Sequence, residues 1–136
     1  MASAEAFGPI ETYLRANWTA TALVFENEDW PTPETPAPFI FVEVDGDLFS
    51  QQSLGAGARD DNLWREAGTL RLHVLAPVGG GSLVARQYAR QAADLFRGKD
   101  VSGITFGDAS LGAGEPGTAD GNYWRFTATI DWERDE

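Results

Sequence analysis

The chain has 136 residues, of which 43% are apolar and 12% aromatic, so residues 1–136 are expected to fold as a single domain. It contains no cysteine, which excludes disulfides and thiolate metal sites. Its net charge is −11, which disfavours binding to nucleic acid. We see no basic stretch followed by an apolar run and no apolar run of about 18 residues. We therefore expect no secretory signal, no membrane contact and synthesis in a cytoplasm.

The first predicted element is a helix near residues 4–17, where Phe7, Ile10 and Leu14 recur at helical spacing. Pro9 suits a first turn, so the regular part is expected to begin near Gly8.

A short strand is predicted at 21–26. The segment Trp30–Pro38 has four prolines in nine residues and is expected to run extended over the surface. A strand follows at 39–45, and Asp45-Gly46-Asp47 predicts a hairpin that returns through residues 48–54.

Residues 55–61 mix glycine with charge and are predicted to be a mobile loop. Residues 69–76 then alternate, with Leu70, Leu72 and Val74 facing inward.

A second and longer helix is predicted at 82–97, between a cap at Ser82 and a left-handed residue at Gly98. Strands are predicted at 101–106 and 123–132, separated by a glycine-rich mobile loop at 112–121. The fold class that follows is α+β: a mainly antiparallel sheet with two helices packed on one face.

Residues suited to catalysis are scarce. His73 lies on the odd face of its strand without partners at the spacing of a triad or metal site, which favours a solvated or interface-facing histidine. The Gly79-Gly80-Gly81-Ser82 run lacks the lysine of a phosphate loop, and Asp45-Gly46-Asp47 lacks the later ligands of a calcium loop. We therefore expect no enzyme activity, no catalytic or metal residue and no cofactor.

Basic residues gather on the second predicted helix. Arg86, Arg90 and Arg97 are spaced by four and seven, so they share a face. This pattern fits either a solubilising surface or a contact with an acidic face of a neighbouring copy, and contacts between unlike faces build rings or filaments.

Trp64 falls in a polar segment beside Arg59 and Arg65. An exposed loop tryptophan is a plausible interface anchor, although loops also fold such residues onto their own core. We take these three residues as further candidates for contacts with a partner or a neighbouring copy.

Five segments in order make up the overall pattern: the helix around 10–16, the short strand before Trp30-Pro31, the strand 39–44, the strand 69–77 that runs into an amphipathic helix, and the strand 124–133 after an Asp/Gly-rich loop. Over nearly the whole chain, this pattern resembles the tail terminator proteins of long-tailed bacteriophages, the family of the phage lambda tail terminator.

The resemblance implies a homo-hexameric ring in the virion tail, made in the host cytoplasm. Such a ring caps the tail tube at its final length, stops tube polymerisation and joins the head-side connector or stopper protein. DNA passes through the lumen without specific binding, which an acidic protein favours. Two alternatives stay open: another head–tail joining ring protein, such as a stopper or adaptor, and a monomeric α+β domain that binds a small ligand.

Overall fold

A computed structural model describes residues 2–30, 36–112, 118–120 and 123–136. The expectations for most of the proline-rich segment at 30–38 and of the glycine-rich loop at 112–121 lie outside these residues. The described elements, in order, are α1 (Ala4–Asn17), β1 (Ala22–Phe25), β2 (Phe39–Gln51), the short 3-10 helix η1 (Arg59–Asp61), β3 (Trp64–Pro77), α2 (Leu83–Asp94), β4 (Asp100–Val101), β5 (Ile104–Leu111), β6 (Thr118–Asp120) and β7 (Tyr123–Asp135).

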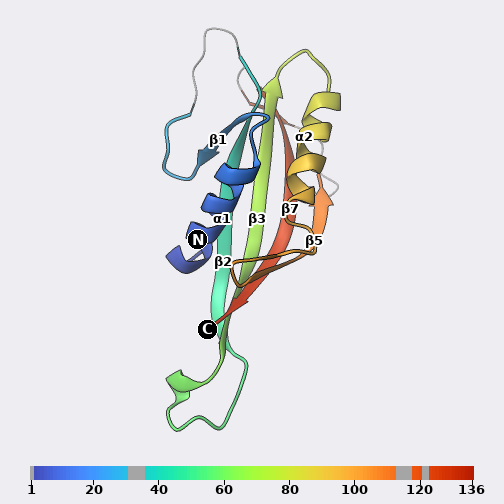
Figure 1. The fold of residues 1–136 in the computed structure, drawn as a ribbon. Coiled ribbons are helices and arrows are strands. Elements are labelled where there is room, and N and C mark those ends of the chain that lie inside the picture. The colour runs from blue at the N-terminus through green and yellow to red at the C-terminus, as the bar shows by residue number, and fades with distance from the viewer. Residues whose placement is uncertain (1, 31–35, 113–117, 121–122) are drawn as a thin grey trace.

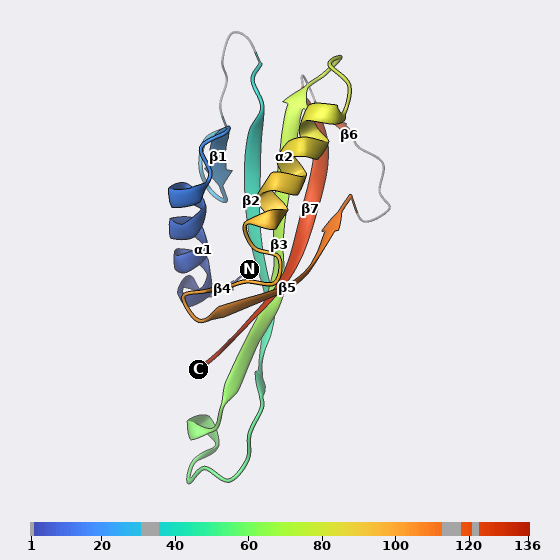
Figure 2. The same ribbon diagram turned by 45° about the vertical axis from the view of Figure 1, so that its right-hand side comes forward.

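The described strands form a mixed sheet in the order β1-β2-β3-β7-β5-β4, with β6 paired to β7. Strand β1 runs parallel to β2, and the other pairs are antiparallel. The sheet is strongly curled, like half a barrel, and both helices lie on its inner side (Figures 1 and 2).

The expected α+β class is confirmed. The expected mainly antiparallel sheet with two helices packed on one face is wrong, because the sheet is mixed and curls around the helices like half a barrel. The segment from Phe25 to Phe39 is long enough to carry the chain back to the start of the sheet, so β1 and β2 run in the same direction. Strands β2, β3 and β7 have 13, 14 and 13 residues, and twist accumulated over such long strands curls the sheet.

One apolar core fills the space between the helices and the sheet. The predicted inward positions Leu70, Leu72 and Val74 on β3 are confirmed, and α2 contributes mostly alanines, which let it approach the sheet closely. Core residues include Ile10, Leu14, Ile40, Val42, Leu70, Leu72, Val74, Ala85, Ala89, Phe96, Phe106, Phe126, Ile130 and Trp132. A smaller apolar cluster on the outer face consists of Val24, Phe39 and Leu75.

Both helices differ from prediction at their ends. Helix α1 begins at Ala4, upstream of the predicted Gly8, because the Ser3 hydroxyl accepts a hydrogen bond from the Ala6 amide and caps it. Helix α2, with 12 residues, is shorter than α1, with 14. Ser82 stands at its N-cap position without a side-chain capping bond.

The hairpin expected at Asp45-Gly46-Asp47 is absent from the described backbone. Strand β2 instead continues straight to Gln51, with a bulge between Gly46 and Leu48. A Cβ at Gly68, which pairs with Gly46, would overlap the Asp45 carbonyl group, so this close crossing needs glycine. The chain therefore turns back only beyond Gln51.

Candidate assembly surfaces

The long strands β2 and β3 extend past the helices as a projection, which we call the arm (residues 46–67). It occupies the lower end of the molecule in Figures 1 and 2. Its tip carries Leu54, which is 89% exposed, and Leu63, which is 41% exposed. A two-stranded ribbon has no core of its own, so these leucines stay exposed in the single chain.

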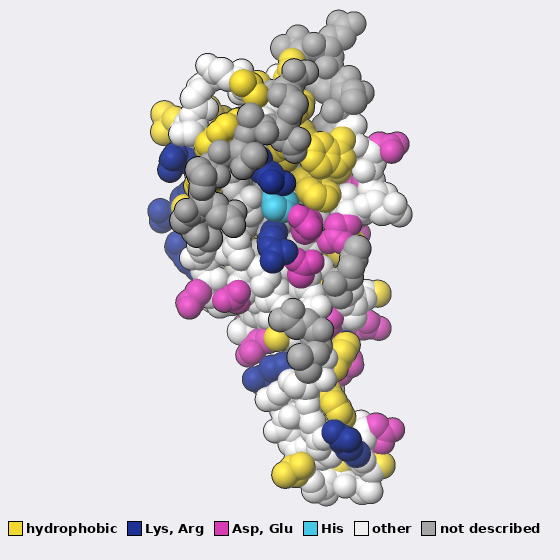
Figure 3. Space-filling view, turned by 180° about the vertical axis from the view of Figure 1, so that it is seen from behind, with side chains coloured by type: hydrophobic (Ala, Val, Ile, Leu, Met, Phe, Trp, Pro, Cys, Tyr) yellow, Lys and Arg dark blue, Asp and Glu magenta, His cyan; other side chains and the backbone are white. Residues whose placement is uncertain are grey.

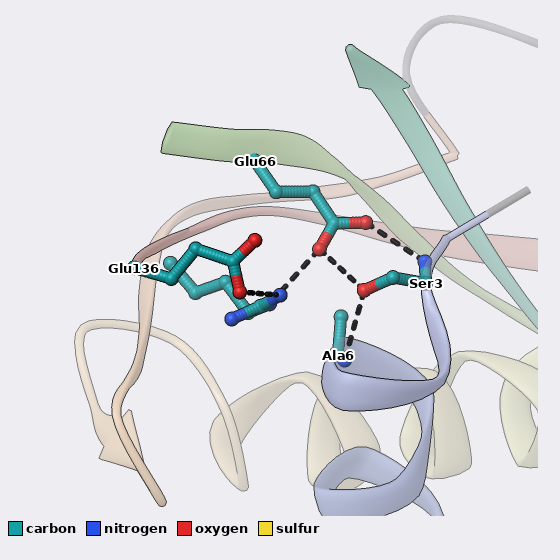
Figure 4. Close-up of polar contacts among 5 residues, drawn as sticks. Ser3, Ala6, Glu66 and Glu136 are labelled. Carbon is teal, nitrogen blue, oxygen red and sulfur yellow. Dashed lines mark hydrogen bonds and ion pairs between the residues drawn. The ribbon is translucent and has the colours of Figure 1, made fainter. Parts of the chain in front are cut away.

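The root of the arm is held by a buried carboxylate, Glu66, which is 2% exposed (Figure 4). It accepts hydrogen bonds from the Ser3 amide at 2.8 Å, the Ser3 hydroxyl at 2.6 Å and Arg134 Nε at 2.9 Å. Arg134 also reaches Glu136 at 3.0 Å. These contacts tie the arm to the start of α1 and to the end of β7.

The hydrogen bonds determine the charge of Glu66. Burial alone raises the pKa of this carboxyl group, but the two bonds from Ser3 and the guanidinium of Arg134 outweigh burial and hold the pKa below its ordinary value. Glu66 is therefore ionised at neutral pH and pairs with Arg134 in surroundings that exclude water.

The β-bulge explains how an aromatic ring joins this cluster. The bulge shifts the alternation of β2 by one residue, so Phe49 lies opposite Glu66. The Arg134 guanidinium carbon lies 5.8 Å from the centroid of the Phe49 ring. One strand face thus combines an ion pair with an aromatic ring at the point where the arm leaves the core.

The arm also contains three of the residues predicted as contacts. Arg59 lies near the tip, where its Nε donates to Gln51 at 2.9 Å and its guanidinium carbon lies 5.9 Å from the Trp64 ring centroid. Arg65 lies near the root and pairs with Asp135 at 2.7 Å, which lowers the pKa of that carboxyl group. Arg59 and Trp64 are thus brought together, whereas Arg65 is engaged within its own sheet.

The structure separates the three predicted arginines of the second helix. Arg90 and Arg97 both pair with Asp94, at 3.1 Å and 3.2 Å. Arg86 instead donates to the Ser82 hydroxyl at 3.0 Å and covers the Phe126 ring at 5.2 Å. Among the described residues, Arg86 forms no ion pair, so it is the member of the set best placed to meet an outside carboxylate.

The outer face of the sheet holds a polar cluster around His73, which Figure 3 shows between basic and acidic side chains. His73 is 7% exposed, so the expectation of a solvated side chain is wrong. Its Nδ1 lies 2.7 Å from the Thr127 hydroxyl, its Nε2 contacts the Glu43 carboxylate, and its ring stacks on Phe41. The cluster joins β2, β3 and β7.

Burial lowers the pKa of His73 below its ordinary value, against the opposing effect of Glu43, and the nearby Arg125 and Arg71 lower it further. The imidazole is therefore neutral at pH 7. Because the Glu43 carboxylate only accepts, Nε2 carries the proton and Nδ1 accepts from the Thr127 hydroxyl.

A chain of hydroxyl, imidazole and carboxylate has the composition of a hydrolase triad, which requires a substrate position beside the hydroxyl. Thr127 lies in the middle of β7, paired with His73 across the ladder, and it is not among the residues that line the hollows beside β5 and at the start of α2. Among the described residues, no group of three or more His, Cys, Asp or Glu side chains could hold a metal ion. No helix in the described parts of the chain is long and apolar enough to cross a membrane.

The chain matches no protein-family model and no curated protein sequence. Twelve chains of solved structures match it. One of them is 18% identical, with a TM-score of 0.66, and the alignment covers 98% of this chain and 96% of the other. At this identity the likeness shows the fold alone, which that chain shares over almost its whole length.

Sequence reasoning missed the Glu66–Arg134 pair, although the sequence contains a signal for it. Glu66 has the same parity as the inward Leu70, and Arg134 has the same parity as the inward Trp132. Two charges of opposite sign on inward positions of neighbouring strands predict a buried pair. The Leu54 tip was missed because residues 48–54 were assigned to a hairpin.

Proposed function

We propose that this protein is a tail terminator of a long-tailed bacteriophage. In this role it assembles as a hexameric ring in the virion tail, caps the tube protein at the final tube length and joins the head-side connector or stopper. It acts by binding these partners, without a cofactor and without a catalysed reaction, and DNA passes through the ring.

The observation that carries this proposal is the arm. It projects beyond the core and ends in a highly exposed leucine, yet its root is fixed by a buried ion pair. A rigidly based arm with an apolar tip suits a protein that acts by contacting other subunits. The resemblance of the whole sequence pattern to tail terminators suggests that these contacts are made in a phage tail.

Charge adds support. With a net charge of −11, the chain repels DNA, which suits a channel that DNA must traverse. A high net charge also keeps a protein soluble whatever its function. The charge therefore adds to the evidence from the arm and is not sufficient without it.

The test is tube assembly from the tube protein of the same phage, followed by negative-stain microscopy. Without this chain, tubes should grow to heterogeneous lengths. With it, they should stop, and a ring should stand at one tube end. Tubes that grow identically with and without the chain, and carry no ring, would refute the proposal. Rings that bind isolated connectors but never tubes would favour another head–tail joining protein.

A further inference from the structure

The arm tip presents an apolar knob beside unpaired acids. Leu54 is 89% exposed, and Leu63 beside it is 41% exposed. Asp60 and Asp61 in η1 are also exposed, and neither forms an ion pair with another described residue. The tip therefore combines a protruding leucine with negative charge.

The opposite end of the molecule has the complementary features. A hollow of about 250 Å³ lies where β3 leads into α2, and it is lined by Val78, Gly79, Gly81, Ser82 and Trp124. Around its rim, Val78 is 54% exposed and Leu83 is 66% exposed. Arg86, the one helix arginine that forms no ion pair among the described residues, lies one turn further along α2.

These two ends are far apart in a single copy. Figures 1 and 2 both show the arm tip at one extreme of the molecule and the start of α2 near the other. The tip therefore cannot fill the hollow of its own chain. A knob on one end and a hollow on the other match only between two copies.

We propose that Leu54 of one copy inserts into the hollow formed by Val78 and Trp124 of the next copy, with Asp60 and Asp61 facing Arg86. The inference deepens the proposed ring function, on which it rests, by naming the two surfaces that meet. Leucine in the hollow removes apolar surface from water on both sides. The acids supply a countercharge for Arg86, which forms no ion pair with another described residue. Because the two surfaces differ, the contact is head-to-tail, which is the kind of contact that builds a ring when the rotation between copies closes.

The first test uses two variants that each destroy one side of the contact. Leu54→Asp replaces the apolar side chain at the arm tip with a charge, and Val78→Asp places a charge in the lining of the hollow. Both positions are exposed, so each variant should keep the thermal stability of the wild type. Each should weaken self-association by about thirtyfold or more, as expected for a residue at an interface hot spot.

Mixing the two variants gives the sharper result. The Val78→Asp copy retains a good knob and the Leu54→Asp copy retains a good hollow, so one intact contact forms between them. Native mass spectrometry should show each variant alone as a monomer and the mixture as a dimer that grows no further. The matched control is Leu111→Asp, another exposed leucine, on β5, which should associate like the wild type.

A cysteine pair gives an independent measurement, because the chain has no cysteine of its own. The combined Leu54→Cys, Val78→Cys variant should form a ladder of disulfide-linked oligomers under mild oxidation. Each single variant should yield at most dimers.

Three outcomes would overturn the proposal: wild-type association by either aspartate variant, a mixture without dimers, or a wild type that stays monomeric both alone and with tail tubes. The same variants separate this inference from the proposed function. If Leu54→Asp rings still cap tubes, the contact is wrong and the terminator function stands. If the mixture forms dimers but wild-type rings leave tube growth unchanged, the contact stands and the terminator function fails.

Discussion

Replacing Glu66 by alanine should test whether the root of the arm contributes to the stability of the whole domain. The change leaves the Arg134 guanidinium, whose side chain is only 10% exposed, without its inner partner, and leaves the Ser3 amide and hydroxyl without their acceptor. Removing one member of a buried pair costs about 3–5 kcal/mol. Glu136 still pairs with Arg134, so we expect about 3–4 kcal/mol. That is a large share of the 5–15 kcal/mol typical of a domain.

The assay is urea and thermal unfolding at pH 7. At about 2.1 cal/mol/K of unfolding entropy per residue, this loss lowers the Tm of the 136-residue chain by about 10–14 °C. The control is Glu136→Ala, whose side chain is 51% exposed and whose loss should cost at most about 0.5 kcal/mol. A Glu66→Ala variant within about 1 kcal/mol of the wild type would show that the network contributes little.

The same carboxylate should also make stability depend on pH. The pKa of Glu66 is lower in the folded chain than in the unfolded chain, so its contribution is complete above the ordinary glutamate pKa. It is lost as the pH falls through the folded pKa. The difference in unfolding free energy between wild type and Glu66→Gln should therefore be constant above about pH 5 and shrink below about pH 4. A difference that grows on acidification would contradict this sign.

Three further predictions concern the core, the β-bulge and the outer face. Phe126→Ala, at a core position that is 8% exposed, should destabilise the fold by about 3–5 kcal/mol, whereas Phe49→Ala, at 42% exposure, should cost clearly less; equal losses in urea unfolding would refute the assignment. Gly68→Ala should cost about 3 kcal/mol or more, because its Cβ meets rigid backbone, whereas Gly57→Ala, with open space around it, should be nearly neutral. His73 is the only histidine, so its proton NMR titration can be assigned directly, and its pKa should lie below about 6.5. Stability should fall as the pH drops through and below about 6.5. A pKa at or above about 6.5 would contradict the burial of the ring.

Period-two alternation predicted much of the sheet. It placed Leu70, Leu72 and Val74 inward, and all three are fully buried. It also located the C-terminal strand, because apolar and polar residues alternate between the buried and the exposed face of a half-buried strand. Such local signals do not require knowledge of which strands are neighbours.

The errors arose where one local signal had two outcomes. Asp45-Gly46-Asp47 has the composition of a tight turn and also of a bulge, and only the pairing of Gly46 with Gly68 decides between them. The parallel direction of β1 likewise depends on where the following segment returns to the sheet. Neither the Gly46–Gly68 pairing nor the direction of β1 can be predicted from the neighbouring residues alone.

For the candidate surfaces, helical spacing predicted one shared face for Arg86, Arg90 and Arg97, but α2 ends at Asp94, so Arg97 lies beyond the helix. Asp94 lies four residues after Arg90 and three before Arg97, so the internal pairing of both was accessible from the sequence. The burial of His73 was not accessible, since it requires Glu43 and Thr127 from two other strands.

The position of the buried pair suits the arm to the contact proposed above. A free two-stranded ribbon would sample many directions, and binding through its tip would lose the entropy of ordering it. Glu66 lies where the arm meets the core and is bonded to Ser3 ahead of α1 and to Arg134 in β7. Three segments distant in sequence thus fix the direction in which the arm leaves the domain. In the proposed contact, much of the ordering needed to present Leu54 is therefore complete before the next copy arrives. A charge pair remote from the tip should then influence association as well as stability.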